Sequence, residues 1–365
     1  MLERESNLKS VSLLDVQRQT NRKYKAAVEA LRRHPVEGFT KLEAMGAIRE
    51  VDWRLRAQEV SKAYREAAVV PNVKGEARSV LVVAATHDEI KSVTHAIRRD
   101  RKRAGELTQG KTFTQHTALN WTEAQKKQTK NYQAGQVLRF HKAVKGVAKN
   151  EALEVVSGKS GITARKASGE TITVSGRQAK AFAVFEKQDI EISAGDKLLL
   201  EANWRDKNFR ATNGELVTVV DVESGSIQLQ DGRHLPAGYC QFSHGYAVTA
   251  HRSQGKTVDF EIIAAERMAH DLFYVSATRA REGLTVITSD KLELQEAIGV
   301  SGDRQSASEL ARRAALAIQV ETLTHDDLFR LYEAQQAQQR IHQPVLEKEI
   351  HHHVNRNHTE LGNGL

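Results

Sequence analysis

The sequence has few of the features that mark secreted, disulfide-bonded or membrane-spanning proteins. It contains a single cysteine, Cys240, and only four prolines in 365 residues, so it can form neither an internal disulfide nor a CxxC metal pair. No apolar run approaches the roughly eighteen residues of a transmembrane helix. The first ten residues, MLERESNLKS, are too charged for a secretory signal. We therefore expect a cytoplasmic protein that does not contact a membrane.

Positive charge, by contrast, is in excess. Lys and Arg number 54 against 46 Asp and Glu, which gives a formal net charge of +8 at pH 7. A basic chain of this kind favours a polyanionic partner, and nucleic acid is the commonest polyanion that such proteins bind.

The first third of the chain predicts helices and one buried strand. The pattern of residues 11–33 predicts a short apolar run followed by an amphipathic helix, and residues 53–68 predict a second helix. The apolar positions of the first helix are Tyr24, Ala27, Val28 and Leu31. The apolar run 79–85, SVLVVAA, is typical of a strand buried on both faces of a parallel sheet, and a polar helix follows it over 87–105. A strand that leads directly into a helix is one unit of an α/β sheet.

The rest of the chain alternates between β-rich and α/β patterns. Between residues 136 and 245, short β-forming segments alternate with Gly, Asn and Asp turns, which predicts a β-rich, barrel-like module. Three histidines at 351–353 are interpreted as part of a solvated tail rather than as a metal site. The expected divisions are a helical segment over 1–70, the first part of an α/β domain over 71–135, the β-rich insertion over 136–245, the remainder of the α/β domain over 246–298 and a polar helical tail over 299–365.

One stretch, GELTQGKT at 105–112, matches the phosphate-binding pattern G-x-x-x-x-G-K-[ST]. A P-loop needs an apolar strand that leads into the loop and an apolar helix whose first amides face the phosphates. Here the charged end of a helix precedes Gly105, and the residues after Thr112 show no apolar helical face. We interpret the match as a coincidence and Lys111 as a loop lysine.

Two other stretches are more specific. TAHRSQGKTVD at 249–259 and YVSATRAR at 274–281 resemble motifs V and VI of superfamily 1 DNA helicases, in the branch that contains RecD and the helicase part of conjugative relaxases such as TraI. LLDVQRQ at 13–19 resembles the family's motif with a second phosphate-directed arginine, and the NGE turn at 213–215 resembles its small β insertion. The resemblance covers about residues 11–295. It implies an α/β fold, a RecA-like parallel sheet with a barrel-like insertion and a helical C-terminal tail.

The resemblance also implies roles for individual residues. Arg279 would be catalytic, stabilising charge on the transferred phosphoryl group, with Arg18 as the second arginine. Gln254 and Gly255 would bind the nucleotide and couple its state to DNA. The residues expected to contact DNA are Thr249, His251 and Thr86. Each of these has an alternative structural interpretation: an arginine paired with a helix end or carboxylate, a strand-to-helix turn, or simple turn packing.

The chain lacks two motifs with which the family binds ATP and Mg²⁺, so the sequence does not decide whether it hydrolyses ATP. In the family the P-loop and the acidic Mg²⁺ motif precede the segment that LLDVQRQ resembles, and no counterpart of either is recognisable here. We expect the second RecA-like domain of a helicase, which would use ATP and Mg²⁺ only with a complementing first domain, on single-stranded DNA. The P-loop domain would be a separate polypeptide, or the chain would be a truncated product. The alternative is a non-enzymatic DNA-binding or partner-binding remnant of such a helicase.

Overall fold

The computed structural model describes residues 18–158, 161–223 and 225–300. The expected polar tail over 299–365 and its three histidines lie outside these residues, except for residues 299 and 300 at the end of the helix α9 (Lys291–Gly299). The start of the first amphipathic helix and residues 13–17 of the LLDVQRQ segment also lie outside them. Among the described residues, no helix is long and apolar enough to cross a membrane.

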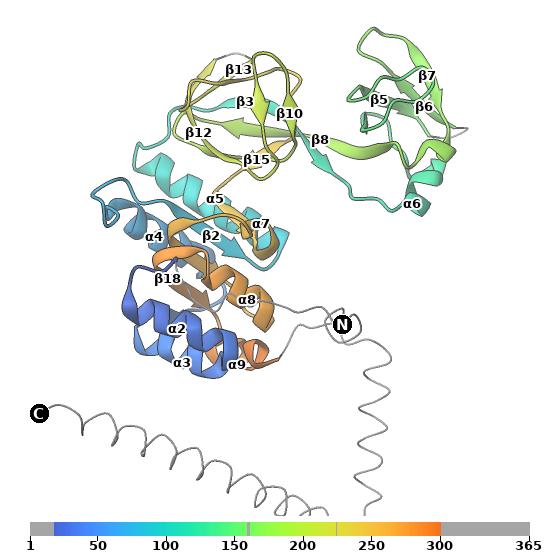
Figure 1. The fold of residues 1–365 in the computed structure, drawn as a ribbon. Coiled ribbons are helices and arrows are strands. Elements are labelled where there is room, and N and C mark those ends of the chain that lie inside the picture. The colour runs from blue at the N-terminus through green and yellow to red at the C-terminus, as the bar shows by residue number, and fades with distance from the viewer. Residues whose placement is uncertain (1–17, 159–160, 224, 301–365) are drawn as a thin grey trace, which may run out of the picture. The chain divides into compact units, whose positions relative to one another are not determined.

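A five-stranded parallel sheet organises the first and last parts of the described chain (Figure 1). Its strand order is β1 (Ile48–Glu50), β18 (Ala280–Thr288), β17 (Val258–Ala264), β2 (Val80–Ala84) and β16 (Ala247–Thr249). All neighbouring pairs are parallel. Every residue of β2 is buried, as the apolar run at 79–85 predicts.

Helices cover both faces of this sheet. One face packs against α4 (Arg56–Val69) and α5 (His87–Arg103), through alternate residues of β2 such as Val80 and Val82. The other face packs against a second set of helices, through Ile263 of β17 and Val286 of β18. That second set consists of α2 (Arg22–Arg33), α3 (Pro35–Ala44), α8 (His270–Ala277) and α9.

The amphipathic pattern of the first helix is confirmed. Asn21 caps α2 by accepting backbone hydrogen bonds from Lys23 and Tyr24, which satisfies amides that the first turn leaves unpaired. The four predicted apolar residues of α2 are fully buried against the sheet.

A β region with two cores interrupts the parallel sheet between α5 and β16. The first core belongs to a module that we call the barrel module, formed by β3 (Lys111–Ala118) and residues 186–244. The second core belongs to residues 119–185, which we call the nested module because they are inserted between β3 and the end of β8. The long strand β8 (Phe182–Ile192) joins the two, since its first residues pair with β4 and its later residues pair with β3.

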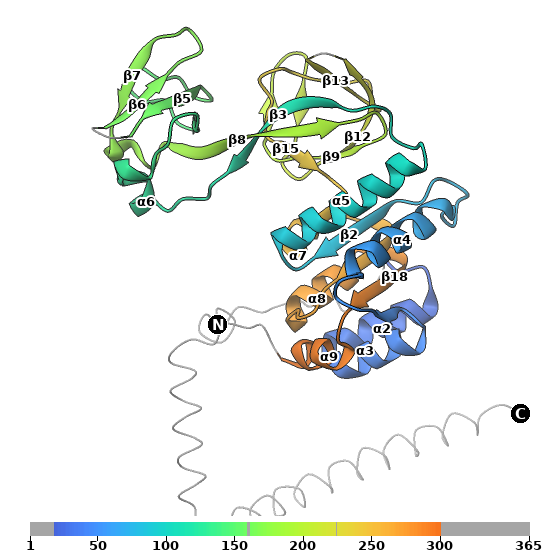
Figure 2. The same ribbon diagram turned by 180° about the vertical axis from the view of Figure 1, so that it is seen from behind.

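The remaining elements of the β region follow in chain order. In the barrel module they are β9 (Lys197–Leu200), β10 (Trp204–Arg205), β11 (Arg210–Ala211), β12 (Leu216–Glu223), β13 (Ser226–Leu229), β14 (His234–Leu235) and β15 (Phe242–His244). In the nested module they are α6 (Glu123–Lys127), η1 (Thr129–Asn131), β4 (Val137–Phe140), β5 (Ala152–Ser157), β6 (Ile162–Arg165), β7 (Thr171–Val174) and η2 (Gly176–Gln178). The predicted α/β class, a parallel sheet interrupted by a β-rich insertion, is therefore confirmed (Figures 1 and 2).

Two local predictions are wrong. The apolar sequence before Arg279 predicts a strand that ends at Ser276, but the segment is the helix α8, in which Phe273, Ser276 and Ala277 are buried at the helical spacing i, i+3, i+4. Lys111 does not lie in a loop, because it is the first residue of β3 and pairs with Ile192. The polar, half-exposed sequence of β3 gives no apolar alternation by which a strand could be recognised.

A buried ion pair joins the barrel module to the parallel sheet and the helices that cover it, residues 18–110 and 245–300, which we call the sheet domain. Asp196, in the turn before β9, has no exposed surface and accepts two hydrogen bonds of 2.9 Å from the guanidinium of Arg98 on α5. The hydroxyl of Tyr246, just before β16, and the backbone N–H of Ser193 each donate to the same carboxylate at 2.8 Å. Burial raises the pKa of Asp196, but the hydrogen bonds and charge of Arg98 outweigh it, and the pKa is lowered.

Candidate functional site

The two predicted phosphate-directed arginines meet at the amino ends of β17 and β18. Arg18 donates from Nη1 to the carbonyl oxygen of Thr278 at 2.5 Å, and Arg279 donates from Nη2 to the hydroxyl of the same threonine at 2.8 Å. Gln19 strengthens the junction by donating to the carbonyl oxygen of Ala280 at 2.8 Å. Burial first, and then the positive charge of Arg18, lowers the pKa of Arg279. Two guanidinium groups are therefore held close together by a single backbone segment.

No described carboxylate neutralises these two arginines through a salt bridge. Each of them instead donates to uncharged oxygens, Arg279 through Nε to the carbonyl oxygen of Val275 at 2.8 Å. Like charges held close together repel each other, and a bound anion would remove that repulsion. The arrangement is suited to an anion with several oxygens, such as a phosphate.

A buried carboxyl group lies behind the arginines. Glu261 of β17 has no exposed surface, and neither of its carboxyl oxygens has a hydrogen-bond partner among the described residues. Burial raises the pKa of Glu261 well above its usual value, although the charges of Arg279 and Arg18 act in the opposite direction. Burial therefore disfavours the ionised form of this carboxyl, and it forms no salt bridge with either arginine.

Gln254 and Gly255 lie near this edge of the sheet. They follow α7 (Ala250–Ser253), and both are exposed. The backbone N–H of Val258, three residues later, donates to the carbonyl oxygen of Arg279 at 3.2 Å. Gly255 has a φ of +78°, a conformation that glycine adopts without strain. The structure therefore brings Arg18, Arg279 and the Gln254–Gly255 turn to the same edge.

The residues predicted to contact DNA lie elsewhere. Thr86 follows β2 and caps α5, and Thr249 ends β16 and caps α7, each through its side-chain hydroxyl. Because β2 and β16 are parallel neighbours, with Thr249 opposite Ala84, both threonines lie at the carboxyl edge of the sheet. His251 is exposed on α7, the short helix that runs from this edge to the Gln254–Gly255 turn. The predicted site is thus divided between the two edges, and α7 connects them.

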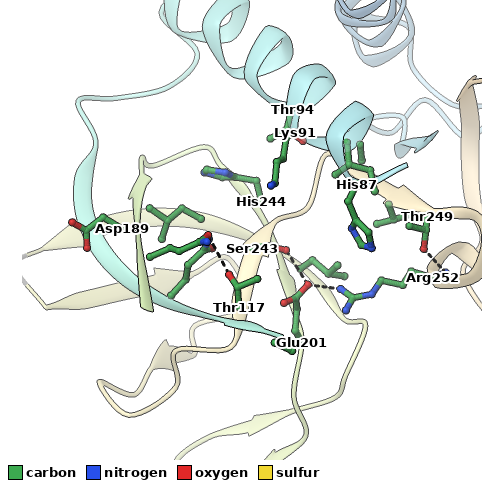
Figure 3. Close-up of a pocket in the computed structure, with 18 of the residues that line it drawn as sticks. His87, Lys91, Thr94, Thr117, Asp189, Glu201, Ser243, His244, Thr249 and Arg252 are labelled. Carbon is green, nitrogen blue, oxygen red and sulfur yellow. Dashed lines mark hydrogen bonds and ion pairs between the residues drawn. The ribbon is translucent and has the colours of Figure 1, made fainter. Parts of the chain in front are cut away.

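A cavity of about 480 Å³ opens at the carboxyl edge, between the sheet domain and the barrel module (Figure 3). Thr249 lines it, whereas Thr86 and His251 do not. His87 and Lys91 of α5 point into it from one side, and Thr117 of β3 lies on the opposite side. A cavity at the carboxyl ends of parallel strands is where ligands commonly bind in α/β sheets.

The two walls of this cavity differ in charge. The sheet domain contributes cationic and neutral donors, among them Lys91 and Arg252. The barrel module contributes the carboxylates of Asp189, Glu191 and Glu201. Arg252 forms an ion pair with Glu201, which also accepts a hydrogen bond from the hydroxyl of Ser243 at 3.2 Å. A phosphate backbone would therefore be bound by the sheet-domain wall.

The sequence analysis missed several residues of these sites. His87 and Lys91 are spaced i, i+4 directly after a buried strand, which is a signal that places both on one helix face. Glu261 is a charged residue inside the otherwise apolar strand FEIIAA, and that contrast marks it. Arg252 lies within the TAHRSQGKTVD segment but was not singled out.

The GELTQGKT match has no P-loop geometry. Its first glycine follows the end of α5, and its GKT enters the antiparallel strand β3 rather than a helix. Without a helix N-terminus the loop has no converging amides for a phosphate. Among the described residues, no group of three or more His, Cys, Asp or Glu side chains could hold a metal ion.

Comparisons with known proteins give only structural similarity. No protein-family profile matches the chain, and no curated protein matches it. Among solved structures, it is similar to the Pif1 helicase from Bacteroides in complex with ADP-AlF3 and ssDNA, with 13% identity, 84% of this chain and 56% of that chain covered, and a TM-score of 0.27. The Pif1 helicase from Candida albicans gives 12% identity, 84% and 60% coverage, and a TM-score of 0.35. The match spans less than two thirds of either helicase.

Proposed function

We propose that this chain is the second RecA-like domain of an ATP-dependent superfamily 1 DNA helicase, of the kind found in RecD and conjugative relaxases. The pairing of Arg18 with Arg279 carries the proposal. Two arginines from motifs about 260 residues apart meet at one edge of the sheet without a neutralising salt bridge among the described residues. This is the arrangement that a γ-phosphate bound by another domain would require.

The residues of this chain would complete half of a nucleotide site. ATP with Mg²⁺ supplies the phosphoryl group when it is held by a P-loop domain, which the described residues do not contain. Arg279 and Arg18 would present positive charge to the phosphoryl oxygens, where negative charge is greatest in the transition state. The Gln254–Gly255 turn would report nucleotide occupancy through α7 to Thr249 and the cavity at the other edge.

Single-stranded DNA would bind along the sheet-domain wall of the cavity. Lys91 and Arg252 can neutralise phosphates, while Thr249 and His87, which line the same wall, can donate hydrogen bonds. Thr86 and His251 lie outside the cavity near the same edge of the sheet, where they would extend the contact. Binding of this type is weak and sequence-tolerant, and it weakens steeply between about 50 and 200 mM salt because counterions are released. The salt dependence is the first property to measure on the purified chain.

The nucleotide half of the proposal is tested by reconstitution. The chain alone should show no ATPase above background, with or without single-stranded DNA. With a first RecA-like domain supplied in trans or fused ahead of Met1, DNA-stimulated hydrolysis should appear. Arg279→Ala should then lower turnover by about 10³–10⁵-fold and leave DNA affinity within a few-fold. Arg279→Lys should rescue poorly, because an ammonium lacks the planar two-pronged geometry of a guanidinium.

A surface arginine provides the control. Arg267 is 77% exposed and pairs only with Glu293 among the described residues, so Arg267→Ala should turn over like the parent. If Arg279→Ala also turns over like the parent, or loses only DNA binding, the assignment of Arg279 is wrong. If the reconstituted pair binds single-stranded DNA and never hydrolyses ATP, the chain is a non-enzymatic binding module instead.

A further inference from the structure

The nested module carries the whole of the chain's excess positive charge. Residues 119–185 contain twelve Lys and Arg, four Glu and no Asp, a formal charge of +8, which equals that of the full chain. The other 298 residues therefore balance, with 42 Lys and Arg against 42 Asp and Glu. Net charge this concentrated is the electrostatic footprint of a polyanion-binding surface.

Most of these basic side chains are exposed and available. Within the described part of the module, seven exposed ones form no salt bridge, namely Lys127, Lys130, Lys142, Lys145, Lys149, Arg165 and Arg177. Three of the four glutamates are already paired with a lysine. Glu151 is the one glutamate of the described module without a salt bridge, so the unpaired charge is predominantly positive.

Several of these residues share one end of the module. The hydroxyl of Tyr132 donates to the carbonyl oxygen of Lys126 at 2.6 Å, which ties η1 to the end of α6. A Cβ atom on Gly176 would lie 3.3 Å from the carbonyl oxygen of Lys127, so η2 also abuts α6. Lys127, Lys130 and Arg177 consequently project from three adjoining elements at the rim of the module, where Figure 1 shows α6.

The same end extends to the loop after β4. The backbone N–H of Lys142 donates to the carbonyl oxygen of Ala181, one residue before Phe182. The ammonium of Lys126 donates to the carbonyl oxygen of Phe182 at 3.0 Å. The backbone of Lys142 therefore adjoins the same end of the module as Lys127, Lys130 and Arg177.

The aromatic residues of the module are not presented to a ligand. Tyr132, Phe140 and Phe182 are buried in its core. Trp121 is half-buried and packs edge-on against Tyr132, with ring centroids 5.1 Å apart. Proteins that bind single strands stack bases on exposed aromatic rings, and this surface offers charge without such rings. Charge alone suits the regular phosphate backbone of a duplex.

We propose that the nested module binds double-stranded DNA through its phosphate backbone and without reading sequence. This contact is separate from the cavity of the sheet domain that would bind single-stranded DNA. It rests on the proposed function only because it takes DNA as the polyanion. The α6 corner, made by Lys127, Lys130 and Arg177, is its centre. Non-specific contacts of this kind have dissociation constants of about 10⁻⁴–10⁻⁶ M at physiological salt.

The test uses the full chain with Lys127→Ala, Lys130→Ala and Arg177→Ala combined. Binding to a blunt 20-base-pair duplex and to a single-stranded oligonucleotide of the same length is measured by fluorescence anisotropy from about 50 to 200 mM salt. Each lost phosphate contact removes about 0.9 from the slope of log affinity against log salt, so the slope for the duplex should fall by about 2.7. Relative to 1 M salt, that change lowers the affinity by about 500-fold at 0.1 M salt. Affinity for the single strand should change less than about three-fold.

A matched triple variant controls for net charge. Lys62, Arg65 and Lys74 are exposed and lie outside the module, so their combined alanine variant should weaken duplex binding by less than about three-fold.

Equal losses in the two triple variants would overturn the proposal, because they would show a diffuse charge effect. Equal loss of duplex and single strand in the module variant would assign the module to single strands. Tighter binding of the parent to phosphatidylserine vesicles than to duplex would assign it to an anionic membrane. Failure of ATP hydrolysis in the reconstituted pair would leave the duplex result intact.

Discussion

Replacing Asp196 with Asn should uncouple the barrel module from the sheet domain. The substitution keeps the shape of the side chain but removes its negative charge. In the parent, the guanidinium of Arg98 donates a hydrogen bond of 2.9 Å to each oxygen of this carboxylate. Breaking one partner of a buried ion pair costs about 3–5 kcal/mol. Arg98 keeps a second carboxylate, Glu191, at 3.6 Å, and its side chain is 12% exposed, so the loss should lie near the lower limit, about 3 kcal/mol.

The assay is chemical and thermal unfolding of the purified chain at several pH values. A loss of about 3 kcal/mol corresponds to a fall of about 4 °C in Tm for 365 residues, because the unfolding entropy is about 2.1 cal/mol/K per residue near 60 °C. Because the pKa of Asp196 is lowered in the folded state, its stabilising effect is fully present above the unfolded pKa and is lost as the pH falls through the folded value. The difference between parent and variant should therefore be constant above about pH 5 and shrink on acidification.

Two further variants make the reasoning refutable. Tyr246→Phe removes the hydroxyl that donates to Asp196 and accepts from Nη1 of Arg101, each at 2.8 Å, and should cost about 1–3 kcal/mol. Combining Asp196→Leu with Arg98→Met removes both charges, so it should be more stable than Asp196→Asn. An Asp196→Asn protein within about 0.5 kcal/mol of the parent, or a difference that does not shrink below pH 4, would show that the pair does not hold the two modules together.

Three other outcomes follow from single positions. Glu261→Gln should raise Tm at pH 7, and the gain should grow as the pH rises above about 4.5, because the folded state keeps this carboxyl protonated while the unfolded state ionises; thermal melts that show a loss at every pH would contradict this. Gly245→Ala should cost about 1–3 kcal/mol in denaturant unfolding, because its Cβ would lie 2.7 Å from Leu216 and 2.8 Å from the backbone of Leu198. Gly238→Ala, whose nearest contact is 3.7 Å, is the matched control and should be nearly neutral. NMR titration of His244 should give a pKa of about 4, lowered first by burial and then by Arg98, and a transition near 6.5 would refute the buried environment.

Local pattern in the sequence was sufficient for the elements whose environment is simple. The β2 run is buried on both faces and the apolar stripe of α2 faces a sheet, so hydrophobic spacing alone predicts each of them. The mismatch between GELTQGKT and a P-loop could also be recognised from its flanking residues, since the phosphate cradle depends on a strand and a helix that the chain does not provide there.

Elements whose environment comes from distant parts of the chain could not be predicted in this way. The apolar sequence before Arg279 predicts a strand, and packing of Phe273 and Ala277 into the core shared with α2 selects the helix instead. β3 has no apolar alternation because its character comes from eight consecutive pairs with β8, about seventy residues further along the chain.

The sequence by itself determined the fold class and the basic character of the chain, and it singled out Arg18 and Arg279 as candidates. Only the tertiary structure decided that Arg18 and Arg279 share one threonine, that Glu261 is buried unpaired behind them, and that the threonines expected to contact DNA lie at the opposite edge. The physical reason is the separation along the chain over which each effect acts. Backbone propensity and hydrophobic spacing act between near neighbours in the chain, whereas charge repulsion, desolvation and cavity shape depend on groups that only folding brings together.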